Sequence, residues 1–209
     1  MIKAVVFDFG GVMTTCSMPE RLRAVCAEIG LDWQVVADGF KNYRLNYDQG
    51  VWDINELYKN VLKDVPQFLE EPYFKKITDA DTASWLYRNE KTRDWMRFLR
   101  ARGFKIGILT NMPPSFAPLF KEHFADFIAT AHAMVISGEE HLVKPMPEIY
   151  HLVEERFKMA GADFSPSEIC FIDDVLVNCE AAAKCGWQYI QFKSNQQVED
   201  DFERLLAVP

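Results

Sequence analysis

The stretch AVVFDFGGVMTT, residues 4–15, joins a short apolar run to a carboxylate and two glycines. Consecutive apolar residues at 4–7 are typical of a strand buried on both faces, as in a parallel sheet. Gly10 and Gly11 then allow the backbone to turn tightly or to pass close to a ligand. Ligands of open α/β sheets bind beyond the carboxyl ends of the strands. The stretch therefore predicts that Asp8 stands at a ligand-binding edge.

Strand and helix signals alternate from residue 104 to the end of the chain. Strands are predicted over 104–110, 132–137, 168–173 and 188–192, and helices over 92–103, 147–161, 178–186 and 195–207. Pro147 suits the first turn of its helix, and Gly103, Gly161 and Gly186 stand where helices end. Strands that alternate with helices predict an α/β fold with a doubly wound parallel, Rossmann-like sheet.

Residues 15–90 have a different pattern, with helical spacing and few strand signals. Helices are predicted within 19–30, 35–50, 54–65 and 72–89. Because a connection from strand to helix normally takes a handful of residues, this segment is predicted to be a helical cap inserted after the first strand, over the carboxyl edge of the sheet. The predicted domains are an α/β core of residues 1–14 and 91–209 and a helical cap of residues 15–90.

The bulk composition excludes several classes of protein. A chain of 209 residues that is 49% hydrophobic can bury one core and a smaller insertion. Its net charge of -8, with no basic run, argues against a nucleic-acid partner. No apolar run is long enough to cross a bilayer, so no membrane partner is expected. Five cysteines with no C-x-x-C pair, and no signal peptide, predict reduced thiols and a cytoplasmic location. The sequence predicts no particular oligomeric state.

Further polar residues follow the predicted strands or lie in the loops beyond them. They are Thr110, Asn111, Lys144, Asp173, Asp174 and, one helical turn later, Asn178. Each one alone also fits a structural role, since Thr-Asn is a common turn and an acidic pair before a helix can cap it. Together with Asp8 they place a carboxylate, a hydroxyl, a cation and an acidic pair at one edge of the sheet. Their shared position favours a functional site over a set of separate structural roles.

This set of motifs resembles the haloacid dehalogenase-like (HAD) hydrolase superfamily over nearly the whole chain. DFGGV matches the first family motif, D-x-D-x-T/V, at Asp8 and Val12 but not at the second Asp. Thr110 matches the second motif, Lys144 in KPMPEIY the third, and the pair Asp173-Asp174 the fourth. The chain looks closest to members with a helical cap after the first motif. These include sugar-phosphate phosphatases and the N-terminal phosphatase domain of soluble epoxide hydrolases.

The resemblance implies a Mg²⁺-dependent phosphatase whose partner is a small phosphorylated metabolite. Asp8 would attack phosphorus and form an aspartyl-phosphate that water later cleaves. Mg²⁺ would be held by Asp8, Asp174 and the backbone carbonyl of Gly10. Lys144 would act with Asp8 in catalysis and pair with the phosphate. Thr110 and Asn111 would bind the phosphate. Asp173 and Asn178 would hold the metal ligands and Lys144 in place.

Gly10 departs from the family pattern, because the second Asp of that motif donates a proton to the leaving oxygen. Such acid–base help is worth about 10²–10⁴ in rate. Either a cap residue, with His132, His141 and Asp48 as candidates, or a bound water would supply the proton, or the substrate has an easy leaving group. A 2-haloacid dehalogenase is an alternative, since halide leaves without a proton, but dehalogenases of this family lack the motif-four acidic pair. A catalytically weak relative that binds a phosphoester is a further alternative.

Overall fold

The computed structural model describes residues 1–15 and 18–207, and its centre is a five-stranded parallel sheet. The strands are β1 (Ala4–Phe7), β2 (Lys105–Thr110), β3 (Ala133–Ile136), β4 (Ile169–Asp173) and β5 (Gln188–Gln191). Their order is β3-β2-β1-β4-β5, and every pair is parallel. The predicted doubly wound α/β fold is confirmed.

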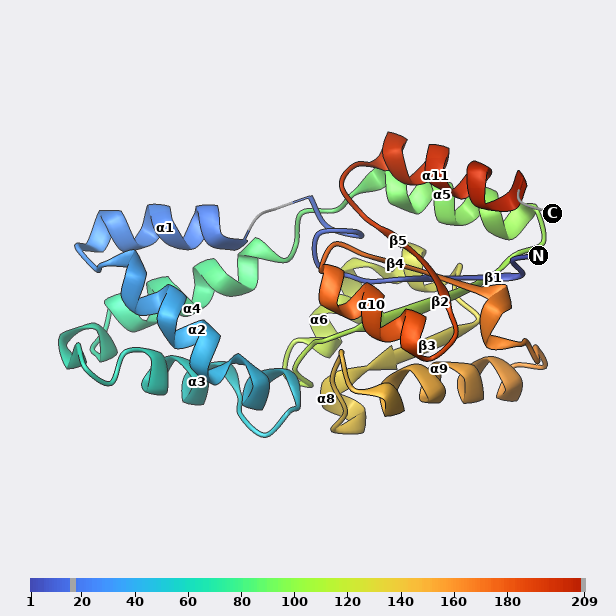
Figure 1. Ribbon diagram of the computed structural model, residues 1–209. Coiled ribbons are helices and arrows are strands. Elements are labelled where there is room, and N and C mark those ends of the chain that lie inside the picture. The colour runs from blue at the N-terminus through green and yellow to red at the C-terminus, as the bar shows by residue number, and fades with distance from the viewer. Residues whose placement is uncertain (16–17, 208–209) are drawn as a thin grey trace.

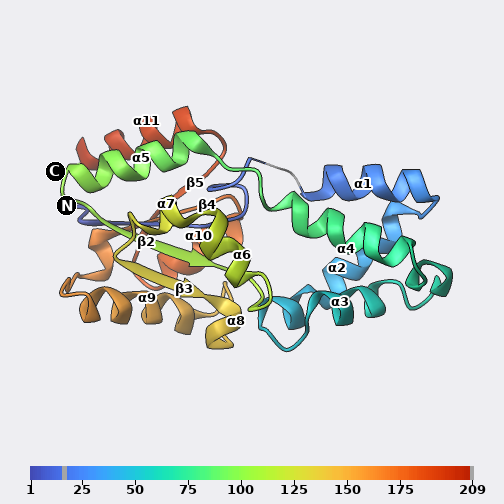
Figure 2. The ribbon, with the colours of Figure 1, turned by 180° about the vertical axis from the view of Figure 1, so that it is seen from behind.

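Helices cover both faces of this sheet (Figures 1 and 2). One face packs against α5 (Glu90–Ala101), α6 (Ala117–His123), α7 (Ala125–Ile128) and α11 (Asn195–Ala207). The other packs against α9 (Pro147–Met159) and α10 (Leu176–Lys184). Side chains of β1 alternate between the two layers, because successive residues of a strand point to opposite faces. Val5 and Phe7 join the first core, whereas Ala4 and Val6 join the second.

The helix boundaries follow the local signals in the sequence. Pro147 occupies the first turn of α9, where its missing N–H costs nothing. Gly103 follows α5 and has a φ of 95°, a left-handed conformation that glycine adopts without strain. At the start of α5 the side chain of Asn89 accepts a hydrogen bond from the backbone N–H of Thr92.

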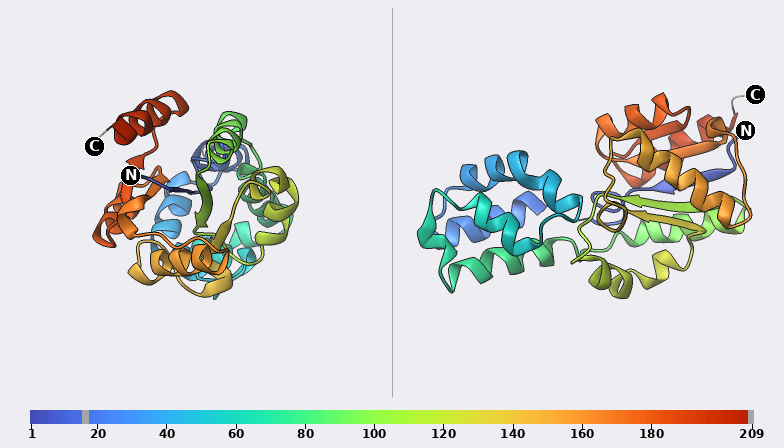
Figure 3. Two further views of the ribbon diagram at one scale, coloured as in Figure 1. Left: turned by 90° about the vertical axis from the view of Figure 1, so that its right-hand side faces the viewer. Right: turned by 90° about the horizontal axis from the view of Figure 1, so that it is seen from below.

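The segment between β1 and α5 forms a helical unit with its own hydrophobic core. Its helices are α1 (Met18–Ile29), α2 (Trp33–Asp48), α3 (Ile54–Val61), the short 3-10 helix η1 (Pro66–Leu69) and α4 (Tyr73–Ser84). Leu22, Val36, Tyr58 and Ile77 pack together at its centre. The unit lies beyond the carboxyl ends of the strands (Figures 1 and 3). The exact domain division at residues 14/15 and 90/91 stays a prediction.

Several short elements were not predicted from the sequence. They are α6 and α7 between β2 and β3, α8 (Ser137–Glu140) after β3, and the 3-10 helix η2 (Pro166–Glu168) before β4. The helices α6 and α7 are too short to show a periodic pattern, and they are fixed by burial of Phe120, Phe124 and Phe127.

None of the helices in residues 1–15 and 18–207 is long and apolar enough to span a membrane. Of the five cysteines, Cys16 lies outside the described residues, and the other four have free thiols.

Candidate active site

Three charged side chains meet at the carboxyl ends of β1 and β4. The two strands are in register, with Phe7 opposite Ile172, so Asp8 and Asp173 stand side by side one residue later. Lys144, from the loop before α9, places its Nζ 2.7 Å from Asp8 Oδ1 and 2.7 Å from Asp173 Oδ2. All three are buried, with exposed fractions of 7% for Asp8, 4% for Lys144 and 0% for Asp173. One ammonium therefore bridges two buried carboxylates.

Burial and charge act against each other in this group. Burial raises the pKa of Asp8 to about 8, while the Lys144 ammonium opposes the shift and Asp173 adds to it. Burial also disfavours the charged form of Lys144, but the carboxylates of Asp173 and Asp8 hold its pKa above the ordinary value. The two carboxylates thus favour the charged form of Lys144, and its ammonium favours ionisation of Asp8 against the effect of burial.

Asp173 has no free hydrogen-bonding capacity, since each of its oxygens already accepts hydrogen bonds. Oδ2 accepts from Lys144 Nζ and Oδ1 from the backbone N–H of Val175 at 2.7 Å. The Asn178 amide adds bonds of 3.1 Å and 3.3 Å to the two oxygens. Asp173 and Asn178 therefore form one hydrogen-bonded group with Lys144, and the part that they play in a reaction stays a prediction.

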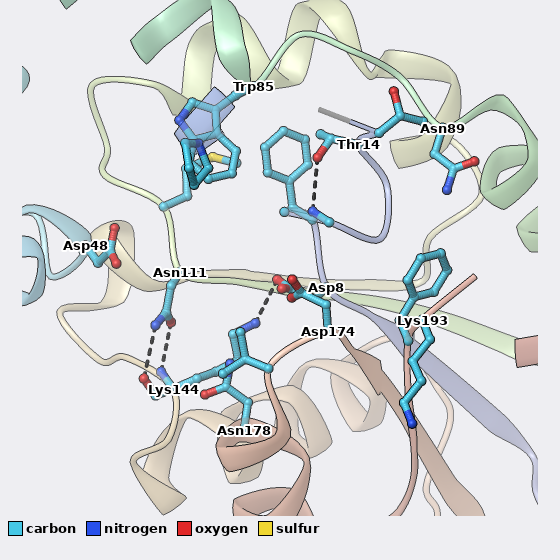
Figure 4. A pocket seen from close by; sticks show the side chains of 18 of the residues that line it. Asp8, Thr14, Asp48, Trp85, Asn89, Asn111, Lys144, Asp174, Asn178 and Lys193 are labelled. Carbon is cyan, nitrogen blue, oxygen red and sulfur yellow. Dashed lines mark hydrogen bonds and ion pairs between the residues drawn. The ribbon is translucent and has the colours of Figure 1, made fainter. Parts of the chain in front are cut away.

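The loop that carries Lys144 is fixed by Asn111. The Asn111 side-chain amide donates to the Lys144 carbonyl at 3.0 Å, and its oxygen accepts from the Lys144 N–H at 2.8 Å (Figure 4). Because both ends of this side chain are occupied, phosphate binding by Asn111 would have to use its backbone. Thr110 ends β2 and is buried, and it is not among the described residues that line the cavity.

Asp174 approaches Asp8 across the glycine turn. Gly11 has a φ of 72°, and a Cβ added to it would lie 2.6 Å from Asp174 Oδ2, so this approach requires glycine. Carboxylate oxygens of Asp8, Asp173 and Asp174 all lie within 4.8 Å of one another. Within the described part of the chain, no other residue's side chain donates a hydrogen bond to the Asp174 carboxylate or forms an ion pair with it. Burial raises the pKa of Asp174, and a hydrogen bond from its own backbone N–H opposes that shift.

A cavity of about 1060 Å³ opens from these carboxylates toward the helical unit. Its floor includes Asp8, Lys144 and Asp174. Arg44 and Asp48 of α2 also line it, with Arg44 Nε 3.1 Å from Asp48 Oδ1. Figure 4 shows Trp85 and Asp48 on one side of Asp8 and Lys193 on the other.

The three candidate proton donors occupy different places. His132 precedes β3 at the opposite edge of the sheet, where its Nδ1 accepts from the Ile106 N–H and burial lowers its pKa, so the expectation for His132 was wrong. His141 Nδ1 donates to the Gln49 carbonyl at 3.0 Å, and His141 is not among the described lining residues. Asp48 lines the cavity but is paired with Arg44.

Arg44 and Trp85 are the site residues that sequence reasoning did not single out. Arg44 lies in α2, and Trp85 follows α4 where the chain leads back to the core. In the sequence, both residues stand at positions that ordinary helix-packing residues also occupy. No local pattern distinguishes a side chain that turns toward the cavity from one that turns toward the core of the helical unit.

Comparisons with known proteins agree with the motifs. A family model for haloacid dehalogenase-like hydrolases matches residues 2–186. Acyl-CoA dehydrogenase family member 10 of Mus musculus is 30% identical over an alignment of 229 residues that covers 99% of this chain and 19% of the mouse protein. The chain thus spans about a fifth of the length of this curated relative.

Solved structures show the same fold. A HAD family enzyme of Bacteroides thetaiotaomicron, BT-2542, in complex with magnesium and inorganic phosphate, superposes with a TM-score of 0.71 at 23% identity, covering 92% of this chain and 95% of that one. L-2-haloacid dehalogenase of Xanthobacter autotrophicus, with chloropropionic acid covalently bound, has a TM-score of 0.63 at 18% identity, with coverages of 90% and 76%. The expected resemblance is confirmed by the family match, and this chain belongs to the haloacid dehalogenase-like hydrolases.

Proposed function

We propose that this protein is a Mg²⁺-dependent phosphatase that hydrolyses small phosphate monoesters through an aspartyl-phosphate on Asp8. The observation that carries the proposal is the acidic cluster. One oxygen of Asp8 forms an ion pair with Lys144, and a carboxylate oxygen of Asp174, which forms no ion pair among the described residues, lies within 4.8 Å of Asp8. A dehalogenase has no need of this second carboxylate, whereas phosphoryl transfer needs charge neutralisation above all.

In this proposal each residue has a defined task. Asp8 attacks phosphorus, and Lys144 offsets the repulsion between its carboxylate and the incoming phosphate. Asp173 and Asn178 hold the ammonium in place through the bonds already described. Asn111 fixes the loop that carries Lys144 and would bind phosphate through its backbone. The buried Thr110 is not among the described lining residues, so the proposal gives its side chain no contact with phosphate. The helical unit would act as a cap that closes the site from water.

The chain offers a suitable set of ligands for a hard divalent cation. No side chain of the described residues forms an ion pair with the Asp174 carboxylate, and Asp8 has a second oxygen beside the one that Lys144 binds. The close approach at Gly11 brings the two carboxylates together, and the Gly10 carbonyl belongs to the same turn. When bound there, Mg²⁺ supplies positive charge for the phosphate oxygens.

A haloacid dehalogenase is the second candidate, and Gly10 is the observation that favours it, because a halide leaves without a proton. The two reactions differ in their need for metal. The experiment therefore measures hydrolysis of p-nitrophenyl phosphate and other phosphate esters, and halide release from 2-chloropropionate, each with Mg²⁺ and with EDTA.

We expect phosphate-ester hydrolysis that Mg²⁺ supports and EDTA abolishes, with no halide release. Asp8→Asn should reduce kcat by several orders of magnitude, because an amide cannot form the phosphoenzyme. Asp163→Asn is the matched control, since Asp163 is an exposed aspartate far from the cavity lining. Halide release in EDTA, or ester hydrolysis that EDTA leaves unchanged, would contradict the phosphatase proposal.

A further inference from the structure

Among the described residues, Trp85 contributes the three atoms nearest to the space where a side chain at position 10 would begin. Gly10 does not have the left-handed φ that Gly11 has, so its backbone would accept any residue. A Cβ built on Gly10 would nevertheless lie 3.0 Å from Cζ3 of Trp85, and its three nearest atoms all belong to that indole ring. The obstacle to a side chain at position 10 is therefore Trp85 and not backbone strain.

Trp85 is held firmly in that place. It ends α4, and its Nε1 donates to Asp81 Oδ1 at 3.0 Å. Asp81 is buried, and its other oxygen accepts from Tyr58 Oη at 3.1 Å. The Arg44 guanidinium lies 5.2 Å from the centre of the indole ring, within the range of a cation–π contact. Moving the ring away from Gly10 would break these contacts.

Trp85 has apolar neighbours on the side of Phe9, while Arg44 lies against its ring. Phe9 lies 6.4 Å from Trp85 between ring centres, and Phe116 lies 6.2 Å from Phe9. Both phenylalanines line the cavity together with Met112 and Pro113. Among the described lining residues, Asp48 is the carboxylate that the helical unit contributes, and Arg44 already binds it.

We propose that Trp85 is a specificity-determining residue that, with Gly10, forms an aromatic wall for the leaving group. The substrate class that this wall fits is the phosphate monoester of an apolar, acidic alcohol, of the aryl or enol type, and not a polyhydroxyl sugar phosphate. A flat π system can pack against Trp85 where it lines the cavity, and an acidic alcohol leaves without a proton from position 10. This inference rests on the proposed phosphatase function.

The chemical step balances without a protein acid at that position. A bond forms between an Asp8 oxygen and phosphorus while the bond from phosphorus to the ester oxygen breaks. Both electrons of the broken bond stay on that oxygen, which leaves as an anion and takes its proton from water. A second water then attacks the phosphorus of the aspartyl-phosphate, restores the Asp8 carboxylate and releases phosphate and a proton.

The first test is kinetic and uses Gly10→Asp, Trp85→Ala and the double variant on a series of aryl and alkyl phosphates with Mg²⁺. The natural protein should prefer aryl esters, with kcat/KM falling steeply as leaving-group pKa rises. Gly10→Asp alone should lose activity on all esters, because its side chain meets the indole ring. The double variant should reduce the aryl-to-alkyl ratio by about tenfold or more relative to Trp85→Ala. A double variant identical to Trp85→Ala would overturn the inference.

The second test needs no activity and compares thermal unfolding of Gly10→Ala in different backgrounds. In the natural protein the added methyl should lower Tm by about 2–4 °C, the shift for a modest steric cost in a chain of this length. In the Trp85→Ala background, or in Trp85→Leu if Trp85→Ala does not fold, that shift should vanish. Trp52→Ala is the matched control, because Trp52 packs on Tyr43 and is not among the described lining residues.

The two tests separate the inference from the function on which it rests. A natural protein without phosphatase activity would refute the proposed function. The Tm shifts of Gly10→Ala in the different backgrounds would still report whether Trp85 occupies the space at Gly10. An equal Tm shift for Gly10→Ala in all backgrounds would refute the contact between Trp85 and position 10 on which the aromatic wall depends. Preference of the active natural protein for sugar phosphates over aryl phosphates would refute the substrate class.

Discussion

Asp8 is a carboxylate that the fold stabilises poorly when it is charged. Its pKa is raised to about 8 from the ordinary value of 3.8, mainly by burial, so the folded protein holds this proton over a range where the unfolded chain has lost it. The protonated form of Asp8 contributes fully to the free energy of unfolding below about pH 4, and this contribution is lost as pH rises from about 4 through about 8. Asn at this position would be neutral throughout the range.

We therefore predict that the Tm of Asp8→Asn, measured in EDTA, increases relative to the Tm of the natural protein as pH rises from 4 to 8. The expected sign follows from the raised pKa, and thermal unfolding at several pH values measures it. Asp163→Asn should show no such gain, because its aspartate is exposed. A difference between Asp8→Asn and the natural protein that stays constant with pH would contradict the electrostatic description of the site.

At the scale of elements, one hydroxyl joins the helical unit to the core. Ser137 Oγ, at the start of α8, donates to the Asp48 carbonyl at 2.5 Å and accepts from the Met112 N–H at 2.8 Å. Ser137→Ala leaves both backbone groups without a partner in a buried place, which should cost about 1–3 kcal/mol of unfolding free energy. Urea unfolding measures it, and exposed Ser167→Ala should change stability by less than about 0.5 kcal/mol. Equal free energies of unfolding for the two variants would show that the hydrogen bonds of Ser137 contribute nothing to stability.

Sequence patterns at this scale predicted the long elements and missed the short ones. β1 is an apolar run, β2 and β4 have apolar centres that end in Thr110 and Asp173, and α9 has both a proline in its first turn and a glycine beyond its end. The segment that forms α6 and α7 contains the same apolar residue types, but tertiary burial of its phenylalanines fixes it, and no period reveals it.

At the scale of the whole molecule, the parallel sheet explains why half of the site was predictable. Parallel strands end at one edge, so residues after β1 and β4 must meet there whatever their separation in the sequence. Asp8, Asp173 and Asp174 were found in this way. Arg44 and Trp85 were not, because their positions depend on how the helical unit sits on the core, and long-range packing decides that.

The most direct test of the phosphatase account is a rapid acid quench during turnover of p-nitrophenyl phosphate with Mg²⁺, followed by mass spectrometry of the peptide that contains Asp8. The account predicts a mass increase of one phosphoryl group on that peptide, localised to Asp8 and absent when EDTA is present. Hydrolysis that continues with no phosphoryl group on Asp8, or with the group on another residue, would contradict it.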